Sequence, residues 1–255
     1  MIKEFKADNL KVKIFETRLD MGVQAANEAI DCIKMLLSEK ESINIVFAAA
    51  PSQNDFLASL SGHHEIDWRR VNAFHMDEYI GLSKDAPQGF GNFLKNAIFE
   101  HLPFRNVFYL KSDEFPVKEN CERYEDLLKK YPIDIVFMGI GENGHIAFND
   151  PHVASFTDTN SVKIVDLDIK CRQQQVNDGC FDSLDAVPTH AITLTIPALM
   201  SAKYLFCMVP TERKAMAIKA TIEGAINEKC PASILRNHTF STLYIDKPSA
   251  SLLTI

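Results

Sequence analysis

The chain has 255 residues, of which 46% are hydrophobic and 24% are charged, as is typical of a soluble globular protein with a sizeable core. Its net charge of −7 argues against nucleic acid or an anionic membrane as the main partner. The N-terminus is too charged for a signal peptide and no apolar run is long enough to span a membrane, so we expect a cytoplasmic protein with no membrane partner.

Helices and strands are predicted to alternate in the first half of the chain. Apolar residues three and four apart predict an amphipathic helix from about Asp20 to Lys40, and similar patterns predict helices at 89–102 and 120–131. Short apolar runs predict strands at Ile43–Ala50, Val71–Met76, Val107–Leu110 and Ile133–Met138. This alternation indicates an α/β fold with a doubly wound, mostly parallel central sheet of about seven strands and helices on both faces.

The second half of the chain continues the pattern without a break. A helix is expected from Thr211 to Thr221, and strands are expected at Val162–Leu167, Ala191–Ile196, Tyr204–Val209 and Thr242–Asp246. No linker rich in Pro, Gly or Ser divides the chain, which favours a single domain over residues 1–255. The six cysteines form no Cys-x-x-Cys pair, and no His/Cys/Asp/Glu cluster has metal-ligand spacing, so we expect reduced thiols and no metal.

A glycine-rich segment, residues 139–150, follows the predicted strand at Ile133–Met138. Open α/β sheets bind ligands at the carboxyl ends of their strands. Gly141 and Gly144 allow backbone N–H groups to approach a ligand closely. The segment also carries an amide, an imidazole and a carboxylate in Asn143, His145 and Asp150. We therefore interpret it as a binding or catalytic site.

The same glycines match Gly-x-Gly-x-x-Gly, the fingerprint of a dinucleotide-binding turn. That fingerprint needs a helix that begins at the third glycine and receives the pyrophosphate. Here Asn149-Asp150-Pro151 would end such a helix within about two turns. A dinucleotide cofactor is therefore disfavoured.

Two other predicted strands also lead into polar side chains. Ser52 follows the strand at Ile43–Ala50, where it either caps a helix or helps to hold an anion. Asp77 and Glu78 follow the strand at Val71–Met76. These carboxylates are either solvated turn residues or include a general base.

Another strand, Tyr204–Val209, leads to polar residues at the start of the predicted helix at 211–221. Lys214 stands in its first turn, where a cation opposes the helix dipole at a cost of about 0.3–1 kcal/mol. A bound anion would explain this placement, although exposed cations are also tolerated there. Because parallel strands end at one edge of a sheet, Asp77, His145 and Lys214 can converge on one phosphorylated small molecule.

Two segments carry a resemblance to a known family. Residues 74–82 read Phe-His-Met-Asp-Glu-Tyr-Ile-Gly-Leu, and residues 139–151 read Gly-Ile-Gly-Glu-Asn-Gly-His-Ile-Ala-Phe-Asn-Asp-Pro. Together they resemble the glucosamine-6-phosphate deaminase (isomerase) family, and the likeness extends through Arg213-Lys214-Ala215 and Glu223-Gly224. The related 6-phosphogluconolactonases share the Gly-x-Asn/Asp-Gly-His core but lack the Met-Asp-Glu-Tyr element.

The resemblance implies a cofactor-free and metal-free conversion of an aminosugar 6-phosphate to a ketose 6-phosphate and ammonia. In that family the residue matching His145 opens the sugar ring, supported by the residues matching Asn143 and Asp150. The aspartate matching Asp77 removes the C2 proton. The residue matching Lys214 binds the phosphate.

Four positions depart from the family pattern. Asn143 stands where many members carry Asp, and Asp150 replaces the usual Glu. A Thr-Gly-Gly-Thr phosphate loop is replaced by Ala49-Ala50-Pro51-Ser52, which leaves Ala50 and Ser52 as its candidate phosphate-binding residues. No second phosphate arginine aligns near Gly179, so Arg172 is the candidate substitute.

Three functions remain open at this point. The first is a deaminase acting on glucosamine 6-phosphate or galactosamine 6-phosphate, which the paired motifs favour. The others are a 6-phosphogluconolactonase-like hydrolase and a non-catalytic sugar-phosphate-binding protein. Relatives are often oligomeric, which leaves a homo-oligomer open.

Overall fold

The computed structural model describes residues 1–110 and 116–254. Its strands are β1 (Lys3–Ala7), β2 (Leu10–Phe15), β3 (Ile43–Phe47), β4 (Val71–His75), β5 (Asp77–Tyr79), β6 (Asn106–Phe108), β7 (Ile135–Met138), β8 (Val162–Asp166), β9 (His190–Leu194), β10 (Tyr204–Val209) and β11 (Ser241–Asp246). Its α-helices are α1 (Arg18–Glu39), α2 (Asn54–Ser61), α3 (Phe90–Leu94), α4 (Val117–Lys130), α5 (Ile169–Asn177), α6 (Ile196–Met200) and α7 (Ala215–Glu223). No helix within the described ranges is both long enough and apolar enough to cross a membrane.

The main sheet has eight strands in the order β1-β2-β11-β10-β7-β3-β4-β6. All neighbouring pairs are parallel except β1 with β2. The predicted α/β class is therefore confirmed, with one strand more than expected. The β1–β2 hairpin was not predicted: β1 is an exposed edge strand with little apolar periodicity, although the alternating apolar residues of β2 were a usable signal.

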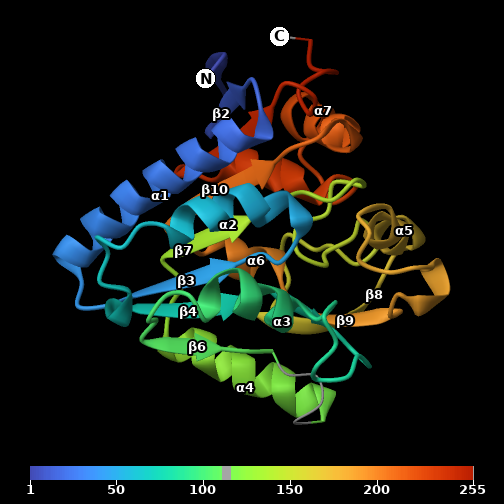
Figure 1. Cartoon of the computed structure of the whole chain (residues 1–255). Coiled ribbons are helices and arrows are strands. Elements are labelled where there is room, and N and C mark those ends of the chain that lie inside the picture. Colours follow the sequence, from blue (N-terminus) through green and yellow to red (C-terminus); the bar gives the residue numbers. More distant parts are fainter. Residues whose placement is uncertain (111–115, 255) are drawn as a thin grey trace.

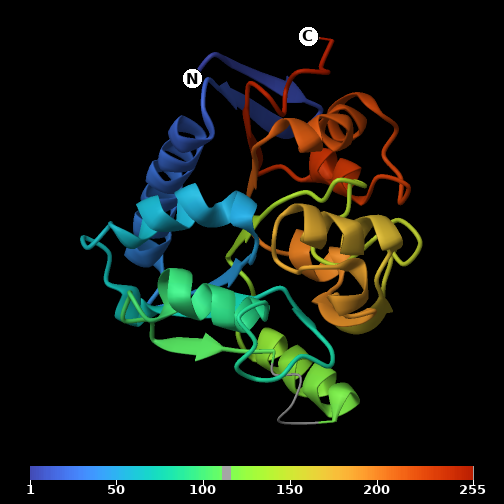
Figure 2. The same ribbon diagram turned by 45° about the vertical axis from the view of Figure 1, so that its right-hand side comes forward.

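Helices cover both faces of this sheet, as the predicted double winding requires (Figures 1 and 2). Side chains alternate along each central strand, so that in β7 Ile135 and Phe137 pack with α1 and α2, whereas Val136 and Met138 pack on the opposite face with α4 and α7. Strands buried on both faces read as continuous apolar runs, which is why these strands were predictable from the sequence.

Phe137 lies at the centre of the first of these two cores. Its side chain is 1% exposed, and its ring centroid lies 5.3 Å from that of Phe47, 4.8 Å from that of Phe56 and 5.6 Å from that of Phe206. We expect Phe137→Ala to lower the free energy of unfolding by about 3–5 kcal/mol, because it leaves a cavity among these rings. Urea denaturation measures this loss. The 53% exposed Phe240 supplies the control, since Phe240→Ala should cost no more than about 1 kcal/mol; equal losses would contradict this account.

The strand order reverses direction between β3 and β7. From β3 the chain runs outward to β4 and β6, then returns to β7 on the other side of β3, and continues to β10 and β11. Ligands bind at such a reversal, beyond the carboxyl ends of the strands. The segments that follow β3 and β7, residues 48–52 and 139–150, therefore meet at the expected place for a site.

A second sheet has three antiparallel strands in the order β5-β9-β8. The chain passes directly from β4 to β5, so that Asp77 leaves the main sheet and pairs with Thr193 of β9. The strands predicted near residues 162–167 and 191–196 belong to this sheet and not to the main one. The interpretation of Asp77 and Glu78 as solvated turn residues is wrong, because both are buried strand residues.

Candidate active site

A cavity of about 60 Å³ lies at the carboxyl ends of β3, β7 and β10. Six residues predicted for the site line it: Ala50, Ser52, Asp77, Gly141, His145 and Lys214. It adjoins a second cavity of about 330 Å³, and both are lined by Ala49, Ala50, Phe90 and Gln175. Together the two cavities reach the size range of small-molecule sites. The predicted convergence of a carboxylate, an imidazole and an ammonium is thus present in the structure.

The imidazole of His145 is held by two neighbours on its Nδ1 side. Nδ1 lies 2.7 Å from Oδ1 of Asn143 and 3.0 Å from Oδ1 of Asp150. The backbone N–H of His145 also donates to Oδ1 of Asn143, which fixes the orientation of that amide. Because both neighbours of Nδ1 are oxygen acceptors, Nδ1 carries the proton of the neutral ring. The unprotonated Nε2 is then available to a ligand.

Asp150 is fully buried, yet its carboxylate is well supplied with donors. Nδ2 of Asn143 donates to Oδ1 at 2.8 Å, and the backbone N–H of Asp168 donates to Oδ2 at 3.0 Å. Burial raises the pKa of Asp150, but hydrogen bonds from His145, Asn143 and Asp168 outweigh it and leave the pKa below its ordinary value. Although Asp150 is one methylene shorter than the Glu of the family pattern, it still pairs with His145 as an ionised carboxylate.

Two glycines of the loop have different roles. A Cβ on Gly141 would lie 2.1 Å from Cε1 of His145, so only glycine leaves room for the imidazole here. Gly144 has a φ of +86°, and a Cβ there would lie 2.9 Å from Sγ of Cys230. Gly144 was predicted to contact the ligand, but it does not line the cavity. Its position indicates that it shapes the turn that presents His145.

Asp77 and Glu78 differ sharply in their hydrogen bonding. Glu78 accepts backbone N–H groups from Tyr79, Phe90 and Gly91, whereas Asp77 lines the cavity. Burial raises the pKa of Glu78 to about 7 against the effect of these donors. Burial, and then the charge of Glu78, raise the pKa of Asp77 well above its ordinary value. A carboxyl group with a raised pKa in a cavity is suited to proton transfer.

Lys214 is 5% exposed and forms no salt bridge within the described ranges. It belongs to a short 3₁₀ turn, Glu212–Lys214, between β10 and α7. Burial lowers its pKa, although Asp178 and Glu142 oppose this shift. A buried ammonium without a paired carboxylate is costly unless an anion binds it. Ser52 lines the same cavity from the turn after β3, so the two residues can reach one anion.

Thr211 precedes that turn but does not cap it, contrary to the expected helix start. Its side chain makes no capping hydrogen bond, and its φ of 83° is strained for a β-branched residue. The backbone N–H of Thr211 donates to both carboxylate oxygens of Asp246, at 3.0 Å and 3.1 Å. This contact fixes the backbone that leads to Lys214.

Arg172 does not reach the cavity. Its Nη2 donates to the backbone carbonyls of Leu184 and Val187, at 2.7 Å and 2.9 Å, so its guanidinium fastens α5 to the following loop. The expectation that Arg172 replaces a phosphate arginine is therefore not supported by its position. The cavity wall on this side is formed instead by two other residues of α5.

Those two residues, Gln174 and Gln175, were missed by the sequence analysis. Both are buried and line the cavity, and Oε1 of Gln174 accepts the backbone N–H of Glu142. The available signal was their spacing from Cys171, since residues three and four apart share a helix face. Two uncharged amides therefore stand on this wall of the site.

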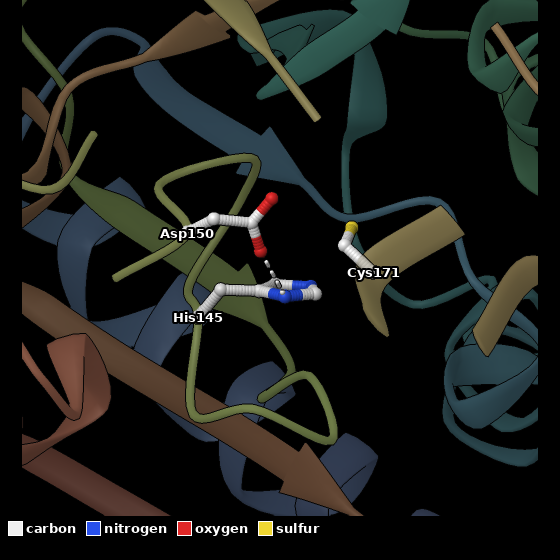
Figure 3. A group of neighbouring side chains, drawn as sticks. All are labelled: His145, Asp150 and Cys171. Atoms are coloured by element: carbon white, nitrogen blue, oxygen red, sulfur yellow. Dashed lines mark ion pairs between the residues drawn. The ribbon is translucent and has the colours of Figure 1, made fainter. Parts of the chain in front are cut away.

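Neither Cys171 nor Asp150 lines the cavity. One ligand atom each from His145, Asp150 and Cys171 all lie within 4.8 Å of one another (Figure 3). Burial, and then the charges of Asp150 and Asp77, raise the pKa of Cys171 well above its ordinary value, so the thiol is protonated. Sequence spacing gave no metal-ligand cluster, whereas the fold brings these three ligand types together from two separate segments.

Comparison with known proteins agrees with these features. Residues 16–244 match the family model described as glucosamine-6-phosphate isomerases/6-phosphogluconolactonase. A glucosamine-6-phosphate deaminase of Listeria innocua is 32% identical over 228 residues, which cover 89% of this chain and 95% of the relative. One of Bacillus thuringiensis is 31% identical over 229 residues, covering 90% and 85%.

Solved structures give the same result. A monomeric glucosamine-6-phosphate deaminase superposes with a TM-score of 0.86 at 30% identity, covering 95% of this chain and 99% of that one. A 6-phosphogluconolactonase from Thermotoga maritima has a TM-score of 0.74 at 21% identity, covering 92% and 99%, and shares the fold. The chain therefore belongs to the glucosamine-6-phosphate isomerase/6-phosphogluconolactonase family.

Proposed function

We propose that this protein is an aminosugar-6-phosphate deaminase that converts glucosamine 6-phosphate to a ketose 6-phosphate and ammonia. What supports this function is that Asp77, His145 and Lys214 line one cavity. Each supplies a different requirement of the reaction, namely a base, a group that moves protons at the ring, and an anion ligand. The relatives of similar length from Listeria innocua and Bacillus thuringiensis are both named glucosamine-6-phosphate deaminase, which favours this chemistry over the lactone hydrolysis found elsewhere in the family.

His145 is assigned to ring opening. Its Nε2 takes the proton of the anomeric hydroxyl and returns it to the ring oxygen, so that the C1–O5 bond breaks and a C1 aldehyde forms. During this exchange the imidazole of His145 is transiently cationic, and the ionised Asp150 on its Nδ1 side stabilises that charge. Asn143 adds orientation without charge, because its amide bridges His145 and Asp150.

Asp77 is assigned to the C2 proton, which becomes acidic only after the aldehyde has formed. Removal of that proton gives an enolamine, and a proton delivered to C1 then leaves an imine at C2. Water adds to the imine carbon, and loss of ammonia gives the ketone. Asp77 belongs to β5 and His145 to the loop after β7, so the base and the ring-opening group approach the sugar from separate elements.

Lys214 is assigned to the phosphate, with Ser52 and the backbone near Ala50 as neighbours. We expect Lys214→Gln to raise KM for the phosphorylated sugar by about 10- to 100-fold, because a charge-assisted contact to the substrate is lost. Steady-state kinetics measure this change. The control is Arg213→Gln next to it, since Arg213 is exposed and donates to the carbonyl of Asn177. A matching rise in KM for both variants would argue against the assignment.

The raised pKa of Asp77 predicts a pH dependence. Only the ionised carboxylate accepts the C2 proton, so kcat/KM falls as the pH falls through that pKa. The acid limb should therefore lie well above the ordinary aspartate value of 3.8. Because the charge of Glu78 contributes to the shift, Glu78→Gln should move the limb to lower pH. A pH profile of kcat/KM tests both statements, and a limb near 3.8 in the unmodified protein would contradict them.

The decisive experiment measures ammonia and ketose phosphate with glucosamine 6-phosphate and, separately, galactosamine 6-phosphate. Release of ammonia and ketose phosphate in equal amounts from either sugar supports a deaminase. The relative rates with the two sugars identify the preferred substrate. A parallel assay with 6-phosphogluconolactone detects a hydrolase. Calorimetric binding of the aminosugar phosphates without turnover by folded protein would overturn the enzyme assignment and leave a binding protein.

A further inference from the structure

The cluster of His145, Asp150 and Cys171 brings three different metal-ligand types into one buried place. His145 and Asp150 come from the glycine-rich loop, whereas Cys171 comes from α5, and Figure 3 shows the three side chains directed toward a common space. Nδ1 of His145 already lies 3.0 Å from Oδ1 of Asp150. The sulfur completes a set whose members lie within 4.8 Å of one another.

Imidazole nitrogen, carboxylate oxygen and thiolate sulfur together suit zinc and its chemical neighbours. The sulfur disfavours Mg²⁺ and Ca²⁺, which take oxygen ligands. Zinc bonds of about 2.0–2.3 Å place tetrahedral ligands roughly 3.3–3.8 Å apart, so Sγ of Cys171 has to move by no more than about 1.5 Å. The carboxylate and a thiolate together neutralise a dication, and the ion can enter past His145, which lines the cavity.

We propose that these three residues form an inhibitory site for Zn²⁺ or a similar thiophilic divalent cation. When the ion binds, the Cys171 thiol loses its proton to solvent, and the His145 proton moves from Nδ1 to Nε2 as Nδ1 becomes a ligand. The imidazole then has no free nitrogen with which to accept the anomeric proton. The bound ion therefore blocks ring opening without occupying the phosphate position.

Titration with zinc chloride tests the consequence for activity, and this arm rests on the proposed function. We expect Zn²⁺ to lower the rate of ammonia release by about tenfold or more, and Cys171→Ala to need about 100-fold more Zn²⁺ for the same loss while remaining active without metal. The matched control is Cys32→Ala on α1, which should stay as sensitive as the unmodified protein. Equal sensitivity of Cys171→Ala would overturn the proposal.

Cobalt chloride provides a readout that does not depend on turnover. Co²⁺ bound to a thiolate gives a sulfur-to-metal charge-transfer absorption, which we expect in the unmodified protein and in Cys32→Ala but not in Cys171→Ala. If the protein lacked deaminase activity but gave this signal, the metal site would stand and the proposed function would fail. Absence of the absorption in the folded, unmodified protein would overturn the metal site whatever the activity.

Discussion

Replacing Asp77 with Asn is expected to lower kcat for aminosugar-phosphate turnover by about 10²- to 10⁴-fold, which is the usual contribution of a positioned general base. Asn fits the same buried position after β4 but cannot accept the C2 proton. KM should change little, because the proposed phosphate contacts of Lys214 and Ser52 are unaltered. The most direct measurement is exchange of the C2 proton with deuterium from solvent, which should stop in this variant.

A matched control for Asp77→Asn lies on the loop that follows β5. Asp85 is exposed, so Asp85→Asn makes the same chemical change away from the cavity and should leave both kcat and C2 exchange unaltered. Thermal unfolding of both variants separates a loss of chemistry from a loss of folding. If folded Asp77→Asn still exchanged the C2 proton at the normal rate, another residue would have to be the base.

Replacing Gly141 with Ala is expected to lower kcat/KM by about 10²-fold through His145. The backbone of Gly141 does not have the positive φ that requires glycine, so alanine is conformationally permitted and the effect is steric. The added Cβ would lie 2.1 Å from Cε1 and 2.3 Å from Nδ1 of His145, so the ring must leave the position in which Asn143 and Asp150 hold it. Misplacement of a catalytic group by about 1 Å is enough for a loss of this size.

Kinetics together with the histidine NMR signals measure this effect, since the displaced ring should lose the downfield Nδ1 proton that its hydrogen bonds produce. Gly62→Ala supplies the control. Gly62 is an exposed residue at the end of α2, where a Cβ would meet its nearest atom, the Ser59 carbonyl oxygen, at an ordinary 3.4 Å. Normal activity of Gly141→Ala would mean that His145 is not held as described, or has no role in the reaction.

Much of the architecture could be predicted because buried parallel strands are uniformly apolar. The apolar runs of β3, β4, β7 and β10 identified these strands in the sequence. Because the strand ends could be located, the polar residues that follow them could be identified as well. The hairpin at the N-terminus was missed because β1 is exposed and because β2 alternates apolar and polar residues instead of forming an uninterrupted apolar run. Asp77 was placed after the correct strand, but the second sheet that receives it could not be foreseen from local sequence.

Local sequence patterns did not predict which side chains of α5 face the cavity. Arg172 was chosen for its charge, yet the helix turns it toward the carbonyls of Leu184 and Val187 and turns Gln174 and Gln175 toward the cavity. A helix in a polar segment gives no hydrophobic stripe from which its buried face could be read. For the same reason, the proximity of Cys171 to Asp150 could not be predicted from the sequence.

By itself, the sequence determined the alternation of helices and strands, the turn chemistry of the glycine-rich loop, and which side chains stand at strand ends, because these depend on residues close together in the chain. Only the tertiary structure decided that Lys214 is buried with no salt bridge to any described residue, that Asp77 is desolvated beside Glu78, and that α5 brings two amides to the cavity and a thiol close to Asp150. Burial and the distances between segments far apart in the sequence come from packing, and desolvation by that packing is what changes the acidity of these groups.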